Sequence, residues 1–133
     1  MTDNLKTEGN FTYAEAGEGP TIVFLHGLMG TLSNFEDTFN YFSENGYRVL
    51  IPELPLYKLP LLKTNVKNLA LFLKDFMDFK KLDDAILLGN SLGGHIALYF
   101  TLNYPEKVNA LVLTGSSGLY EKAMGDSFPK RGN

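Results

Sequence analysis

The sequence contains no cysteine, only two histidines and no long run of apolar residues. Without cysteine, disulfide bonds, thiolate catalysis and cysteine-ligated metal sites are excluded, and a cytoplasmic location is expected. No apolar run approaches the roughly 18 residues of a transmembrane helix. The polar first ten residues lack the apolar centre of a signal peptide, so none is expected. Because His26 and His95 stand apart from any cluster of carboxylates, we expect no metal site, and nothing in the sequence calls for a cofactor.

The chain also has no excess of basic residues. Its 12 Lys and Arg against 15 Asp and Glu give a net charge of -3, with an isoelectric point near 5.3. This balance argues against nucleic acid as a partner. A length of 133 residues, 44% of them hydrophobic, is enough for one domain with a buried core and for no more than one.

Short apolar runs alternate with segments of helical period. The predicted strands cover residues 11–13, 21–25, 47–51, 85–88 and 110–113, and the predicted helices cover residues 33–44, 66–79 and 92–104. Ser33 and Glu36 form a capping-box pattern at the first helix, and Thr64 or Asn65 caps the second. This order predicts right-handed βαβ crossovers and a three-layer α/β/α fold with a mostly parallel sheet. Ligands bind such sheets at the carboxyl ends of the strands.

Two stretches have a structural and a functional interpretation. The second predicted helix repeats apolar residues at helical spacing, which indicates a face buried against the sheet rather than a ligand-binding face. They are Val66, Leu69, Leu73, Phe76 and Met77. After it, the charged residues Lys80, Lys81, Asp83 and Asp84 are interpreted as a solvated turn.

The motif Gly89-Asn90-Ser91-Leu92-Gly93 follows a predicted strand and opens a predicted helix. In this context Ser91 is a candidate nucleophile on a sharp turn, which Gly89 and Gly93 allow to pack tightly. The N–H of Leu92 would be one oxyanion donor, aided by the helix N-terminus. The alternative is a glycine-rich helix start with a capping serine. A phosphate-binding loop is a weaker reading, since no Gly-Lys-Ser/Thr follows.

A second motif, His26-Gly27-Leu28-Met29-Gly30, follows an earlier strand at the same sheet edge. With the Ser91 motif and the segments 48–55, 104–108 and 111–113, it resembles the α/β-hydrolase superfamily, in particular serine esterases and C–C bond hydrolases. The resemblance covers Phe11 to Gly118. It implies that Leu28 supplies a second oxyanion N–H, and that His26 and Gly27 shape this loop. Met29 and Leu119 are expected at the substrate pocket.

In this family the acid follows a later strand, commonly the second after the serine turn, and the catalytic histidine follows the last strand. Here Thr114 to Gly118 offers no carboxylate, and Glu121 and Asp126 lie in what resembles the start of a cap. His95 comes one helical turn after Ser91, where a packing role is expected rather than that of a base. The sequence therefore resembles the N-terminal half of a hydrolase: residues 1–118 as a core that lacks the C-terminal strands, and 119–133 as a mobile tail.

Three expectations follow from a partial fold. The complete protein is a hydrolase of an ester-like or similar carbonyl compound, whereas this chain alone has little or no turnover. The alternative is a non-catalytic binding or assembly module that retains the fold. In either case the strand at 110–113 exposes an apolar edge, which predicts self-association or binding of a C-terminal fragment.

Overall fold

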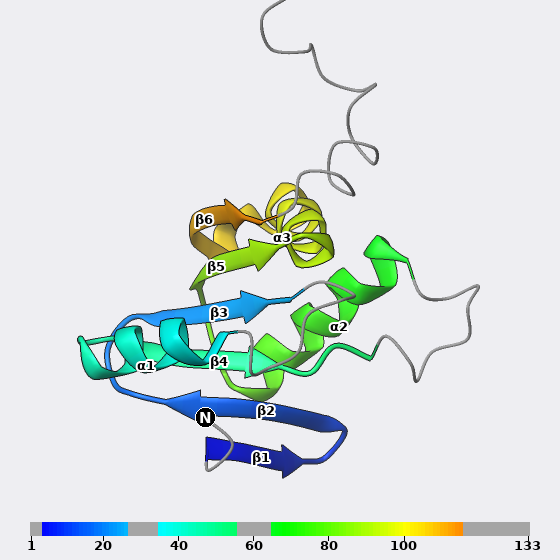
Figure 1. Ribbon diagram of the computed structural model, residues 1–133. Coiled ribbons are helices and arrows are strands. Elements are labelled where there is room, and N and C mark those ends of the chain that lie inside the picture. The colour runs from blue at the N-terminus through cyan, green and yellow to red at the C-terminus, as the bar shows by residue number, and fades with distance from the viewer. Residues whose placement is uncertain (1–3, 27–34, 56–64, 116–133) are drawn as a thin grey trace, which may run out of the picture.

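A computed structural model describes residues 4–26, 35–55 and 65–115 of the chain (Figure 1). Its elements are β1 (Leu5–Glu8), β2 (Phe11–Ala16), β3 (Thr21–Leu25), α1 (Glu36–Glu44), β4 (Arg48–Pro52), α2 (Val66–Phe79), β5 (Ala85–Asn90), α3 (Leu92–Asn103), the 3-10 turn η4 (Pro105–Lys107) and β6 (Val108–Thr114). The strands form one sheet in the order β1-β2-β4-β3-β5-β6. The β1–β2 and β2–β4 pairs are antiparallel, and the other three pairs are parallel. The predicted mostly parallel α/β sheet is confirmed.

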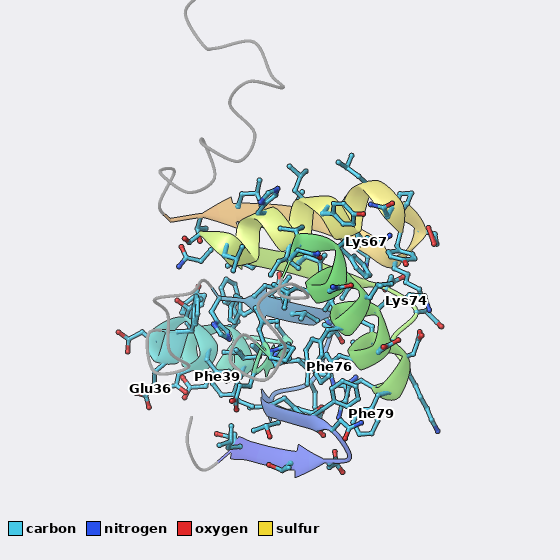
Figure 2. The ribbon with its side chains drawn as sticks, turned by 90° about the vertical axis from the view of Figure 1, so that its right-hand side faces the viewer. Glu36, Phe39, Lys67, Lys74, Phe76 and Phe79 are labelled. Atoms are coloured by element: carbon cyan, nitrogen blue, oxygen red, sulfur yellow. The ribbon has the colours of Figure 1, made fainter. Side chains whose placement is uncertain are left out.

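Helices cover both faces of this sheet, as the three-layer prediction requires. Alternate residues of a strand point to opposite faces, so Phe24 packs with Phe39 of α1 while Leu25 packs with Phe76 of α2 and Phe100 of α3. Figure 2 shows Phe39 and Phe76 on opposite sides of the sheet. Since the inner strands are buried on both faces, they are continuous apolar runs rather than alternating ones.

The second helix matches its prediction most closely. The side chain of Asn65 accepts a hydrogen bond of 2.8 Å from the N–H of Asn68, so Asn65 is the N-cap. The apolar face is buried, with Leu73 and Phe76 fully inaccessible to solvent. The interpretation of this stripe as core is therefore confirmed.

Strands β2, β5 and β6 extend further than predicted. Two further boundaries involve residues that were expected to begin or end an element. Helix α1 begins at Glu36, and Phe35 rather than Ser33 occupies the N-cap position, without a capping hydrogen bond from its side chain. Ser33 itself lies outside the described residues. Pro52 is the last residue of β4 rather than the residue that stops it. Both corrections shift an element by a few residues, which is the usual error of boundaries inferred from pattern.

Strand β1 was not predicted. Its four residues are all exposed, so the sequence carries no buried face that could reveal a strand. Glu8 pairs directly with Phe11 across a two-residue turn, in which Gly9 has a φ of +59°. A Gly-Asn dipeptide favours this type of hairpin, and it was the available signal.

Lys81, Asp83 and Asp84 are exposed, as the prediction of a solvated turn requires, but the side chain of Lys80 is not. Its Nζ donates to Glu15 Oε1 at 2.9 Å and to the hydroxyl of Tyr13 at 3.1 Å, and lies 4.6 Å from the Tyr13 ring centroid. Arg48 Nε donates to the other oxygen of Glu15 at 2.8 Å. We call Tyr13, Glu15, Arg48 and Lys80 the Glu15 cluster. It joins the β-hairpin, β4 and the end of α2, and the Glu15 and Lys80 side chains are only 15% and 13% exposed.

The charges of this cluster favour one another. Burial is the largest influence on Glu15 and acts upward, but the bonds from Lys80 and Arg48 together outweigh it and lower the pKa of Glu15. Burial acts downward on Lys80, and the bonds to Tyr13 and Glu15 outweigh it and raise the pKa of Lys80. The stabilisation from Glu15 is therefore present above the ordinary glutamate pKa and is lost as pH falls through the lowered value. That from Lys80 is lost as pH rises through the raised value.

We expect Glu15→Gln to lower the free energy of unfolding by about 1 to 2 kcal/mol near neutral pH, after allowance for solvent screening. Near pH 3, where Glu15 is largely protonated in the unfolded chain, the difference from the wild type should shrink. Urea unfolding at both pH values measures this. Asp78→Asn is the matched control, because Asp78 pairs with Lys74 on the surface and should change stability much less. An equal loss in both variants would contradict a special role for the cluster.

Beyond these elements, the expected tail at 119–133 lies outside the described residues. The same holds for most of the irregular connection expected between Pro52 and Lys63. Within the described ranges, no helix has both the length and the apolar character needed to cross a membrane.

Candidate active site

The two candidate motifs meet at one edge of the sheet. Strands β3 and β5 are parallel neighbours, and Leu25 pairs with Gly89, so His26 follows the end of β3 beside Asn90, the last residue of β5. The arrowheads of β4, β3, β5 and β6 all point to this side in Figure 1. The structure thus brings the segment at His26 to the segment at Ser91, as the sequence predicted.

Ser91 has a backbone conformation that residues other than glycine rarely adopt. Its φ is +57° and its ψ is -121°, which lies outside the left-handed helical region because ψ there is positive. A helix N-cap normally has extended backbone, and its side chain bonds to the first turn. Ser91 occupies the N-cap position of α3, but its side chain makes no capping hydrogen bond. Strain of this kind costs about 1 to 3 kcal/mol and concentrates at functional sites.

The glycines on either side of Ser91 make this turn possible. A Cβ at Gly89 would lie 2.5 Å from Gly93 O and 2.6 Å from Gly94 Cα. A Cβ at Gly93 would overlap the carbonyl group of Leu25 and approach His26 N to 2.9 Å. All of these are backbone atoms, so neither position has room for a side chain. The start of α3 therefore lies directly against the end of β3.

His26 is buried at the end of β3. Its side chain is 6% exposed, and its ring centroid lies 6.5 Å from that of Phe35. The predicted role of His26 in shaping the following segment stays a prediction, since residues 27–34 lie outside the described residues. His95 lies in the first turn of α3, half-buried, and its backbone N–H donates to Ser91 O at 3.3 Å.

Strand β6 contacts the serine turn from the other side. The N–H of Ser91 donates to Thr114 O at 3.3 Å. Asn90 is the register partner of Thr114, and Thr114 Oγ1 lies 3.5 Å from Asn90 Oδ1. Sequence reasoning placed the segment from Thr114 to Gly118 at this sheet edge and Asn90 within the serine motif, but it assigned no role to Asn90, Thr114 or Gly115. The available signal was the Thr114-Gly115 dipeptide at the end of a strand that neighbours the motif.

The electrostatic environment of Ser91 comes mainly from the backbone. The first N–H groups of an α-helix have no intrahelical acceptor, and they carry the positive end of the helix dipole. Leu92 is the first residue of α3, and no acidic residue lies in the first turn. A negatively charged oxygen beside Ser91 would therefore be stabilised. Among the described residues, no three His, Asp or Glu side chains gather in a way that could hold a metal ion.

Several predicted site residues lie outside the described residues. They are Gly27, Leu28, Met29 and Leu119. Glu121 and Asp126, which were expected at the start of a cap rather than in the site, also lie outside the described residues. The second oxyanion donor and the pocket walls therefore remain predictions.

Known proteins are similar to this chain in sequence and in fold. Residues 20–131 match the family model of the alpha/beta hydrolase fold. A 2-hydroxy-6-oxo-6-phenylhexa-2,4-dienoate hydrolase of Comamonas testosteroni is 35% identical over 80% of this chain and 40% of its own length. A hydrolase of the same name from Burkholderia cepacia is 35% identical over 90% of this chain and 45% of its own length.

A solved structure is more similar. The alpha/beta hydrolase enzyme MGS-MChE2, from the metagenome of sediments of the Mar Chica lagoon, is 56% identical, with a TM-score of 0.81. The match covers 92% of this chain and 57% of that one. The chain thus spans less than half the length of the two dienoate hydrolases. The family model matches residues 20–131, and the chain has the parallel sheet and the glycine-flanked serine turn described above. The chain therefore belongs to the alpha/beta hydrolase fold family.

Proposed function

We propose that this chain carries the nucleophile and one oxyanion donor of a serine hydrolase. The observation that supports this most directly is the backbone of Ser91, which is strained and does not serve as a helix cap. In the proposed reaction Ser91 Oγ attacks a carbonyl carbon, and the oxygen that becomes negative accepts a hydrogen bond from the N–H of Leu92. Leu28 would supply the second donor. Collapse of this intermediate expels the leaving group and leaves an acyl-serine, which water then hydrolyses.

The proton of Ser91 needs a base, and we place it beyond this chain. His95 is the histidine closest to Ser91 in sequence, but it lies one turn along α3, and its backbone N–H donates to Ser91 O. The two dienoate hydrolases have more than half of their length outside the match, which leaves room for an acid and a histidine. Without a base, only modest catalysis by the oxyanion hole would remain. The isolated chain should therefore show little or no turnover.

The substrate class follows from the relatives and is part of the proposal. Two of them are named for 2-hydroxy-6-oxo-6-phenylhexa-2,4-dienoate, so cleavage of a carbon–carbon bond beside a ketone is the first candidate. An ester is the second candidate, because an ester also has a carbonyl carbon that a serine hydroxyl can attack.

A chimaera tests this proposal. It joins residues 1–115 of this chain to the part of the Mar Chica hydrolase that follows the strand equivalent to β6. We expect the chimaera to hydrolyse p-nitrophenyl butyrate or the phenyl dienoate, and the isolated chain to remain at the buffer rate. A folded chimaera that cleaves neither compound would count against the function. If the isolated chain turned over substrate as fast as the chimaera, the proposal that this chain lacks the base would be wrong.

One observation favours the second candidate function, an assembly module. In the described part of the sheet, β6 is an outer strand without a charged residue, and Val112 and Leu113 are 41% and 40% exposed. The opposite outer strand, β1, instead carries Lys6 and Glu8. Charges protect a sheet edge from pairing, whereas an apolar edge invites it.

We therefore expect the isolated chain to sediment above its monomer mass of 14.8 kDa. Val112→Lys should shift it toward the monomer. Leu102→Lys is the matched control, since Leu102 is 70% exposed but belongs to α3 rather than to β6. Sedimentation velocity over a range of concentrations measures all three proteins. A monomeric wild type at every concentration would show that the edge does not pair.

A further inference from the structure

At the end of β6, next to the serine turn, the Asn90 amide occupies the space that a side chain at position 115 would need. Gly115 has a φ of +85°, a value that favours glycine. A Cβ placed there would overlap Oδ1 of Asn90 and lie 2.6 Å from Asn90 Cγ. The chain therefore passes closely over the Asn90 amide, whose residue directly precedes Ser91.

Three contacts tie the same two segments together. Asn90 and Thr114 are register partners, the Ser91 N–H donates to Thr114 O at 3.3 Å, and Thr114 Oγ1 lies 3.5 Å from Asn90 Oδ1. On the other flank, Gly93 is fixed against the Leu25 carbonyl. The strained serine is thus held between the ends of β3 and β6.

We propose that Asn90 and Gly115 form a steric pair that positions Ser91. The absence of a side chain at 115 lets the Asn90 amide fill the space between the ends of β5 and β6, and this keeps the Ser91 N–H on Thr114 O. Asn90 and Gly115 are positioning residues, since they act through the backbone of Ser91. Their importance for hydrolysis rests on the proposed function, but the steric pair does not.

A double-mutant cycle on the 133-residue chain tests the pair. The variants are Gly115→Ala, Asn90→Ala and both together. Gly46→Ala is the matched control, because Gly46 has a φ of +93° and no atom lies within 4 Å of the place its new methyl group would take. Both glycine variants share the backbone penalty, and only Gly115→Ala adds the overlap. The folding constant, from urea unfolding, should fall about tenfold further for Gly115→Ala than for Gly46→Ala.

Asn90→Ala should rescue Gly115→Ala, so that the double variant is more stable than the sum of the single changes predicts. Exchange of the Ser91 amide, followed by NMR, gives a second readout. Relative to the Val23 amide it should accelerate in Gly115→Ala and recover in the double variant, because Ser91 is bonded to the end of β6.

Strict additivity would overturn the proposal, as would an unchanged Ser91 amide in Gly115→Ala. If Gly115→Ala does not fold, the double variant decides: a folded double variant supports the pair, and an unfolded one refutes it. None of these readouts requires hydrolysis. A catalytically inert chimaera would therefore defeat the proposed function and leave this result intact.

Discussion

Replacing Ser91 by alanine is expected to lower the kcat/KM of the chimaera about a millionfold, the loss typical of removing a serine nucleophile. Alanine keeps the Cβ and therefore the backbone strain, so the fold should persist. The loss of kcat/KM would then be caused by the missing hydroxyl rather than by unfolding. Hydrolysis of p-nitrophenyl butyrate and of the phenyl dienoate measures the effect.

Ser91→Gly separates chemistry from strain. Glycine tolerates the positive φ at this position, so in the isolated chain this variant should be about 1 kcal/mol more stable than Ser91→Ala. In the chimaera both variants should be equally inactive. If Ser91→Gly is instead the less stable of the two, the backbone at Ser91 is not under strain. If Ser91→Ala retains most of the hydrolysis, another residue is the nucleophile.

Gly93→Ala is expected to cause the largest loss of stability, about 3 kcal/mol or more, because its methyl group would meet rigid backbone. The new Cβ would overlap the carbonyl of Leu25 and lie 2.9 Å from His26 N. Both belong to the end of β3, which lies between β4 and β5 and cannot move without breaking the sheet. Urea unfolding of the isolated chain gives the difference.

Gly94→Ala is the matched control, one residue further along α3. The nearest atom to a Cβ there is Gly89 O at 3.3 Å, and the next contacts are at 3.6 Å. Alanine also favours the helix over glycine by about 1 kcal/mol. This variant should thus change stability little. Similar losses in both variants would show that the tight contact at Gly93 is not what restricts the position.

The serine turn could be predicted from sequence because its requirements are local. Gly89 and Gly93 are needed within two residues of Ser91, and the strand and helix on either side give clear patterns of their own. The parallel orientation of the inner strands was likewise predictable, since apolar runs that alternate with helical segments indicate βαβ crossovers.

Contacts between distant segments could not be predicted. Lys80 is part of a charged run that is typical of a solvated turn, and only the folded sheet brings it to Glu15. Asn90 and Gly115 are separated by the whole of α3 and η4, so nothing local reveals that one excludes a side chain from the other. Strand β1 was missed for a different reason, because all of its residues are exposed and no pattern of burial marks it.

The strand order also has a consequence for synthesis. Strand β3 is synthesised early, whereas its neighbours β4 and β5 are both synthesised later. Ile22 therefore cannot pair with Ile86 until β5 has been made. Until both β4 and β5 have been made, this apolar strand has at least one open edge and is exposed to wrong partners. Closure requires contacts between residues far apart in sequence, which slows folding. The Ser91 N–H donates to Thr114 O at the end of β6, the last described strand, so the serine turn cannot complete this contact until β6 has been made.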